Sequence, residues 1–233
     1  NYRRDAEAAR ETVAAIEALG RRARAYAASV DDPGDAERMV NDAVADFGFV
    51  DILVNNAGIA SRGQSVAKTD PAELERVVRI HALAPHRLCQ LVLPSMRTRP
   101  RGDIVMISSV ATLHLAAGGA PYNMGKAALE ALAMTLAKEV KKSGIRVNVV
   151  APGLVETDMG VRLARAMTGR RDLEGLRSLD AELPFGRACQ PLDVALAETD
   201  ELLVAAHVDV RLHRVEQHLL LDVLQVGPPR GDA

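Results

Sequence analysis

The sequence predicts an α/β fold built on a doubly wound parallel sheet, and three observations lead to this prediction. Helical patterns and short apolar runs alternate between residues 5 and 150, as expected for right-handed crossovers that connect parallel strands. Glycine and proline stand where the helical patterns should begin and end. The strand patterns are short and mostly apolar, as in sheets that helices cover on both faces. A three-layer sandwich is therefore expected.

The N-terminal elements alternate between helix and strand. Apolar residues at three-and-four spacing predict a helix over residues 5–19, and residues 23–30 predict a strand. A second helix is expected over residues 33–48, because proline suits the first turn of a helix and glycine its end. The mostly apolar run at 50–54 predicts a strand that is buried on both faces of the sheet.

The same alternation continues as far as residue 150. We expect one globular domain, because 233 residues with 48% apolar content suffice for a single substantial core. The further expected elements are helices over 71–80, 82–96 and 121–143 and strands over 104–107 and 145–150.

Composition excludes several classes of function. Lys plus Arg total 29 against 31 for Asp plus Glu, so no basic field points to nucleic acid. No apolar run reaches the roughly 18 residues that span a membrane, and the N-terminus has no apolar signal segment. Cys89 and Cys189 suit a reducing cytoplasm. His207, His213 and His218 share no helical face, so we expect no metal site.

Three residues have the spacing of a carbonyl-reducing site. Lys126 follows Tyr122 by one helical turn, so both side chains leave the same helix face. An ammonium beside a phenol should lower the pKa of the tyrosine, which can then exchange a proton. Ser109, thirteen residues before Tyr122, could hold the substrate oxygen. The alternatives are a surface Tyr–Lys pair and a serine that caps a turn.

Two more motifs join this trio. Asn55-Asn56-Ala57-Gly58 follows a predicted strand, at the strand end where open α/β sheets bind their ligands. Pro152-Gly153 follows the strand predicted at 145–150. In combination, these motifs resemble the short-chain dehydrogenase/reductase family over residues 1–195, with most similarity to its 3-oxoacyl-thioester (acyl-carrier-protein) reductase-like branch.

The resemblance implies a Rossmann-type domain and assigns roles to the trio. Tyr122 would be the general acid in reduction, Lys126 would lower its pKa and hold the nicotinamide ribose, and Ser109 would bind the substrate carbonyl. His81 stands where the family has an asparagine that holds a water of the proton relay. Imidazole can also relay protons, so His81 is a candidate for a supporting role, with a structural role as the alternative.

The resemblance also implies a cofactor. Arg3 and Arg4 stand where the family meets the adenosine ribose, and guanidinium there favours the 2′-phosphate of NADP, with NAD as the alternative. Ser29 replaces the usual aspartate at the adenine. The residues expected to bind the cofactor are Arg3, Ser29, Val30, Asn55, Asn56, Ala57, Gly58, Tyr122, Lys126, Pro152, Gly153, Val155 and Thr157.

The two ends of the sequence depart from the family. No first strand or glycine-rich loop precedes residue 1, so we expect an N-terminally truncated domain. Residues 196–233 form an atypical tail without the expected final strand. A reading-frame change or gene-model error would explain this tail, and a lineage-specific helical extension is the alternative.

The sequence therefore predicts an NAD(P)-dependent oxidoreductase that transfers hydride between the cofactor and a ketone or secondary alcohol, such as a 3-oxoacyl thioester. The substrate pocket is expected from residues 110–121 and 156–183. A homodimer or homotetramer is expected through the helices at 71–96 and 121–143. The alternative is a non-catalytic truncated remnant or oligomerisation partner.

Overall fold

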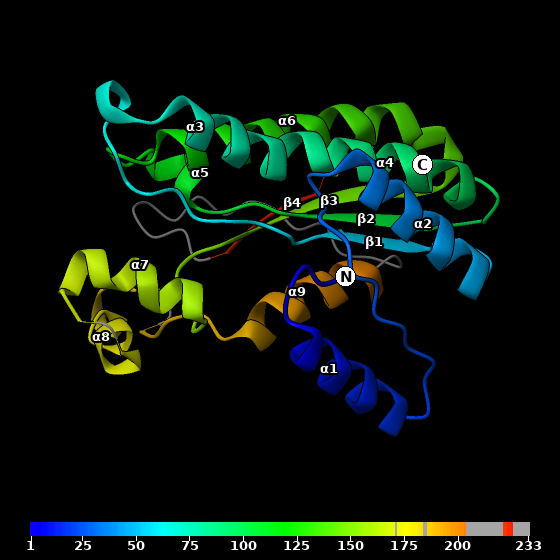
Figure 1. The fold of residues 1–233 in the computed structure, drawn as a ribbon, viewed down its shortest axis with the longest axis horizontal. Coiled ribbons are helices and arrows are strands. Elements are labelled where there is room, and N and C mark those ends of the chain that lie inside the picture. Colours follow the sequence, from blue (N-terminus) through cyan, green and yellow to red (C-terminus); the bar gives the residue numbers. More distant parts are fainter. Residues whose placement is uncertain (171, 184–185, 204–220, 226–233) are drawn as a thin grey trace, which may run out of the picture.

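A four-stranded sheet forms the centre of the protein, described here by a computed structural model of residues 1–170, 172–183, 186–203 and 221–225 (Figure 1). Three strands are parallel and lie in the order β1 (Ile52–Asn55), β2 (Gly102–Ile107) and β3 (Ile145–Pro152). β4 (Leu221–Gln225) pairs antiparallel with β3. The parallel sheet flanked by helices confirms the predicted fold class.

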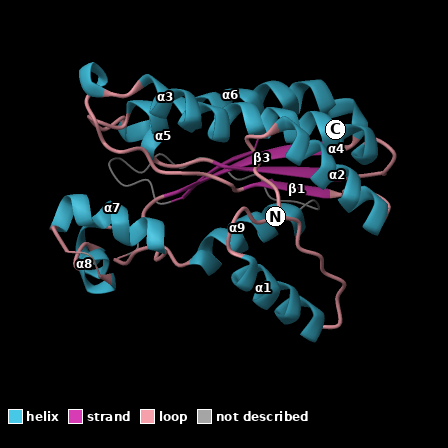
Figure 2. Cartoon of the chain, in the orientation of Figure 1, coloured by secondary structure: helices cyan, strands magenta, loops and turns pink. Residues whose placement is uncertain are grey.

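Helices lie on both sides of this sheet (Figure 2). The helices on one side are α2 (Pro33–Phe47), α3 (Pro71–Val78), α4 (Ala84–Met96), α5 (Ala111–His114) and α6 (Ala120–Val140), and α1 (Ala6–Ala18) and α9 (Pro191–Leu203) lie on the other. α7 (Asp158–Thr168) and α8 (Leu173–Arg177) follow β3. None of the helices in the described ranges is long and apolar enough to cross a membrane.

The core lies between β2, β3 and the helices α4 and α6. Ile104 and Met106 of β2 are fully buried and belong to the same apolar cluster as Val147 of β3 and Leu129 of α6. All six residues of β2 are buried, so this central strand has the two covered faces expected of a parallel sheet. The core thereby fixes the ends of β2 and β3, where the site residues begin.

Sequence signals located most helix ends correctly. Asp32 and Asp70 cap α2 and α3 by accepting hydrogen bonds from backbone amides in the first turn, and both helices begin with the expected proline. Gly144, with φ of 69°, ends the segment that follows α6. The helices predicted at 71–80 and 82–96 are joined by a π-helical turn, Arg79–Leu83. Such turns often mark functional sites.

The predicted strand at 23–30 is wrong. Only Ala27 pairs, in a single parallel bridge with Tyr2. Its two hydrogen bonds run from Tyr2 N–H to Tyr26 O, at 3.1 Å, and from Ala28 N–H to Tyr2 O, at 3.0 Å. A strand needs a continuous partner, and Tyr2 supplies just one pairing residue among those described.

The prediction that the strand at 50–54 is buried on both faces is also wrong. Ile52 and Val54 of β1 remain 47% and 39% exposed, because β1 is the edge strand of the described sheet. A cavity of about 290 Å³ adjoins this strand, and its lining includes Asn1, Val30, Leu53 and Val54.

The expected absence of a final strand is corrected by β4, which comes from the tail. Its residues pair with β3 from Asn148 to Pro152. Helix α9 runs across residue 195, the predicted end of the domain. The predicted domain division at 195/196 and the proposed origin of the tail stay predictions.

Candidate active site

Ser109 and Tyr122 meet at the carboxyl end of β2. Ser109 lies in the turn after this strand, where its Oγ accepts a hydrogen bond from Ala111 N–H at 3.2 Å. Pro121 stands at the N-terminus of α6, which places Tyr122 in the first turn. The Ser109 side chain interacts with the Tyr122 hydroxyl, and this interaction favours the ionised tyrosine. The sequence spacing of thirteen residues is therefore realised as a contact.

Lys126 does not lower the pKa of Tyr122 as the sequence predicted. Burial raises the pKa of Tyr122, and only the hydrogen bond with Ser109 opposes this effect. Lys126 Nζ instead donates to the carbonyl oxygen of Ile107, and lies 5.8 Å from the centre of the Tyr122 ring. Burial lowers the pKa of Lys126 itself to about 8, although Glu130 raises it in part. The helix face was predicted correctly, but the lysine side chain turns to the end of β2.

His81 packs against Tyr122 from the π-helical turn. Its ring is 1% exposed and stands edge-on to Tyr122, with centroids 5.1 Å apart and an interplanar angle of 79°. Nε2 lies 2.8 Å from the carbonyl oxygen of Ile59. Burial, with a smaller contribution from the charge of Lys126, lowers the pKa of His81 to about 4, against the hydrogen bond with Ile59. The imidazole is therefore neutral at physiological pH.

Two glycines make room for this imidazole. A Cβ atom added to Gly58 would lie 2.7 Å from His81 Cε1, and one added to Gly125 would lie 2.9 Å from His81 Cβ. Both distances are shorter than a normal packing contact. His81 Nδ1 is buried and has no hydrogen-bond partner among the described residues. The ring thus links the loop after β1 to helix α6 and keeps one nitrogen free.

Four of the predicted cofactor-binding residues line one cavity at the end of β1. Asn56 and Ala57 line the 290 Å³ cavity together with Asn55 and Val30. The Asn55 amide donates to Met106 Sδ at 3.3 Å, whereas its buried Oδ1 has no partner in the described part of the chain. A buried carbonyl oxygen without a donor costs free energy, so this end of the strand is suited to a ligand that carries donors.

The loop after β3 lies beside Ser109. Val110 N–H donates to Pro152 O at 3.1 Å, which joins the Ser109 turn to Pro152-Gly153. Farther along, Val155 forms a parallel bridge with Cys189. Thr157 caps α7, since its Oγ1 accepts a hydrogen bond from Gly160 N–H at 3.1 Å. Of the four predicted residues here, Pro152 is thus bonded to the residue that follows Ser109.

The predicted cofactor-binding residues near the N-terminus, Arg3 and Ser29, do not line the 290 Å³ cavity. Arg3 is exposed and follows the bridge residue Tyr2. Ser29 N–H donates to Asp35, at 2.9 Å, and its hydroxyl donates to Asp31. These bonds tie Ser29 to the start of α2, so it has no contact with the cavity that Val30 lines.

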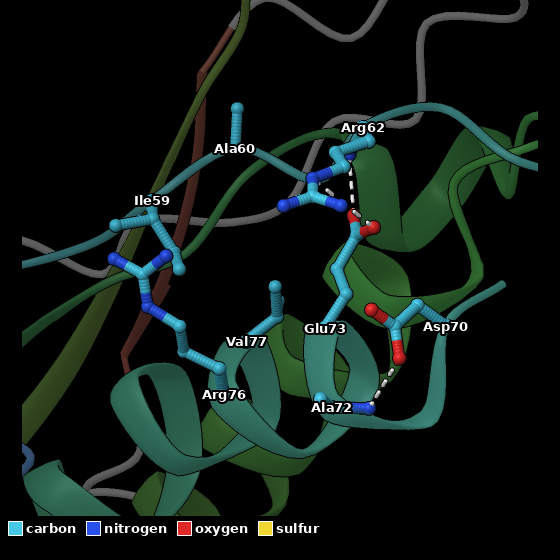
Figure 3. Close-up of a pocket in the computed structure, with 8 residues that line it drawn as sticks. All are labelled: Ile59, Ala60, Arg62, Asp70, Ala72, Glu73, Arg76 and Val77. Atoms are coloured by element: carbon cyan, nitrogen blue, oxygen red, sulfur yellow. Dashed lines mark hydrogen bonds and ion pairs between the residues drawn. The ribbon is translucent and has the colours of Figure 1, made fainter.

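A second cavity and a partly buried carboxylate were not predicted from the sequence. The cavity, of about 190 Å³, lies between the loop at Ile59–Arg62 and α3, with Glu73 and Arg76 in its wall (Figure 3). The carboxylate is Glu130 on α6, four residues after Lys126, and that spacing was the available signal. No set of three or more His, Cys, Asp or Glu side chains in the described ranges could hold a metal ion. His207, His213 and His218 lie outside those ranges.

Comparisons with known proteins agree with this geometry. A family model described as short chain dehydrogenase matches residues 2–168. A 3alpha-hydroxysteroid dehydrogenase of Mediterraneibacter gnavus is 34% identical over 169 residues, which cover 72% of this chain and 64% of that protein. The 3-oxoacyl-(acyl-carrier-protein) reductase FabG of Salmonella typhimurium is 35% identical over 179 residues, 77% of this chain and 70% of the relative.

A solved structure has a similar fold. The crystal structure of NAD+-bound xylitol dehydrogenase superposes with a TM-score of 0.73 at 27% identity, and the match covers 82% of this chain and 78% of that one. The chain thus spans between about two thirds and four fifths of the lengths of these proteins.

Proposed function

The chain belongs to the short-chain dehydrogenase family, and on this premise we propose that it is an NAD(P)-dependent oxidoreductase that interconverts a ketone and a secondary alcohol. The observation that carries the proposal is that Ser109 interacts with Tyr122 beside the buried Lys126. A hydroxyl pair of this kind can bind a carbonyl oxygen and give it a proton.

The chain's own residues supply the proton chemistry. The raised pKa of Tyr122 keeps the phenol protonated at neutral pH, which is the form that donates a proton to a carbonyl oxygen. Ser109 is held by Ala111 N–H, so its hydroxyl can orient the same oxygen. Lys126 is anchored by the end of β2 and contributes a buried positive charge. In the oxidative direction, Tyr122 would accept the proton.

A nicotinamide cofactor fits the residues at the end of β1. The orphaned Asn55 Oδ1 and the cavity lined by Asn56 and Ala57 support binding there, with Gly58, Pro152, Gly153, Val155 and Thr157 as further proposed contacts. Such a cofactor would give or take the hydride. We prefer NADP, because the exposed Arg3 can pair with a 2′-phosphate, although the xylitol dehydrogenase structure is NAD+-bound.

The proposed substrate is a small carbonyl compound or its alcohol, such as a 3-oxoacyl thioester. Similarity to FabG supports the thioester, and similarity to the 3alpha-hydroxysteroid dehydrogenase supports a cyclic ketone or alcohol. The proposed pocket walls include α5, α7 and α8, which lie in the segments 110–121 and 156–183. Free, buried Cys89 and Cys189 support action in a reducing compartment such as the cytoplasm.

Assembly into a homodimer or homotetramer is part of the proposal. Helix α6 presents an exposed apolar stripe at three-and-four spacing, made of Met124, Ala127, Ala128, Ala131 and Met134. Burial of this stripe against a second copy would remove it from water. We expect Ala131→Glu to reduce the molar mass measured by light scattering, whereas Ala14→Glu on α1 should leave it unchanged.

The proposed function is tested by cofactor binding and turnover. NADPH and NADH are titrated against the purified chain by cofactor fluorescence, and NADPH oxidation is followed with a 3-oxoacyl thioester, a 3-ketosteroid and a simple ketone. Binding with turnover of any of the three supports the oxidoreductase. A folded chain that binds neither cofactor would contradict it and would favour the non-catalytic alternative.

A further inference from the structure

Glu130 of α6 faces the turn that carries Ser109. It lies one helical turn beyond Lys126 and two turns beyond Tyr122. Its side chain is partly buried. The proton chemistry described above does not use it.

One carboxylate oxygen holds both ends of the Ser109 turn. The hydroxyl groups of Ser108 and Thr112 both donate to Glu130 Oε1, the second at 2.9 Å. The Thr112 hydroxyl is also 3.0 Å from the carbonyl oxygen of Ser109, so its one proton is shared between these acceptors. The two donors bracket Ser109 in the sequence. The carboxylate therefore ties the turn to the helix that carries Tyr122.

The same carboxylate is the negative charge nearest to Lys126 along α6. Lys126 is 4% exposed, and a buried ammonium needs a compensating charge. The titratable groups that face it are Tyr122 and Glu130 from its own helix and His81 from the π-helical turn. Of these, only Glu130 is negative at neutral pH, since His81 and Tyr122 are then uncharged.

We propose that Glu130 is a positioning residue with two separable effects: its hydrogen bonds hold Ser109 in register with Tyr122, and its charge stabilises the buried ammonium of Lys126 one helical turn away. The proposal rests on the proposed function for its meaning in catalysis. Its geometric and electrostatic content can be measured without turnover.

The charge effect is tested by NMR titration of lysine labelled with 13C at the ε-carbon. The chain has five lysines, and Lys126→Met assigns the resonance of Lys126. Glu130→Gln keeps an acceptor oxygen but removes the charge, so the midpoint of Lys126 should move to lower pH. Glu139→Gln, an exposed change on the same helix, should leave the midpoint in place. An unmoved midpoint in Glu130→Gln would overturn this half of the proposal, whether or not the chain turns over substrate.

The tether is tested with Thr112→Val and Glu130→Asp. Thr112→Val removes one hydrogen bond and keeps the charge, so kcat should fall several-fold while the midpoint of Lys126 and the pH profile stay in place. Glu130→Asp shortens the side chain, which moves the carboxylate oxygen away from Ser108 and Thr112 but keeps the negative charge. This variant should therefore behave like Thr112→Val. Unchanged kcat in both variants, with wild-type turnover present, would overturn the tether. Absence of wild-type turnover would contradict the proposed function instead. The tether would then be tested by the width of the Ser109 amide resonance in the NMR spectrum of Thr112→Val. A broader resonance than in the wild type would support the tether, and an unchanged resonance would overturn it.

Discussion

The turn after β2 and the edge of β1 lie at the same end of one sheet but differ in how their polar groups are satisfied. Around Ser109, hydroxyl, ammonium and carboxylate groups are bonded to one another or to the backbone. At Asn55, a buried oxygen has no partner among the described residues, and a 290 Å³ cavity adjoins it. The half of the site proposed to transfer the proton is therefore preorganised, whereas the half proposed to bind the cofactor is open.

Strands β2 and β1, which lead to these two halves of the site, also differ in how deeply their side chains are buried. Ile104 of β2 is fully buried, whereas Ile52 of β1 is 47% exposed. Truncation of Ile104 to Ala should lower the free energy of unfolding by about 2–5 kcal/mol, because it leaves a cavity in the core. The matched change Ile52→Ala should cost about 1 kcal/mol or less. Urea denaturation followed by circular dichroism compares the two, and equal losses would contradict the contrast.

The preorganised half also depends on close packing around His81. Gly125→Ala would place a methyl group 2.9 Å from His81 Cβ, and such overpacking should cost about 1–3 kcal/mol. The control is Gly34→Ala in α2, where the added carbon meets one side-chain oxygen at 3.4 Å. This control should be neutral or slightly stabilising. Equal melting temperatures for the two variants would show that His81 can move aside.

A pH experiment tests whether His81 is held neutral. Its folded-state pKa of about 4 lies below the ordinary value of 6.5. Between these two pH values, His81 therefore binds a proton in the unfolded chain but not in the folded chain. Stability should therefore fall as pH falls from 6.5 to 4, by up to about 1.4 kcal/mol per pH unit. His81→Asn should remove this slope, and His86→Asn, an exposed change, should keep it. Thermal unfolding at several pH values gives the slopes.

The features predicted correctly from the sequence are those that a single local signal determines. Prolines and glycines located the helix ends, and the spacing of Ser109 and Tyr122 survived as a contact. Prediction failed where a result depends on distant partners. The segment at 23–30 has strand composition but one pairing residue, and the rotamer of Lys126 is set by the end of β2. Neither partner is visible from local pattern.

The smallest expected effect is on cofactor affinity, in the half of the site proposed to bind the cofactor. If Arg3 contacts a 2′-phosphate, Arg3→Glu should raise the Kd for NADPH about tenfold and leave the Kd for NADH nearly unchanged. Arg21→Glu is the matched exposed control. An equal loss of affinity for both cofactors in Arg3→Glu, or no loss for either, would show that Arg3 does not recognise the 2′-phosphate.

The central claim is that Tyr122 transfers the proton in a preorganised site. The most direct measurement compares turnover by Tyr122→Phe and Tyr26→Phe, each alongside NADPH binding. We predict that Tyr122→Phe binds NADPH with unchanged affinity and loses about 10²–10⁴ in kcat, whereas Tyr26→Phe retains wild-type kcat. Wild-type kcat in Tyr122→Phe would contradict the claim.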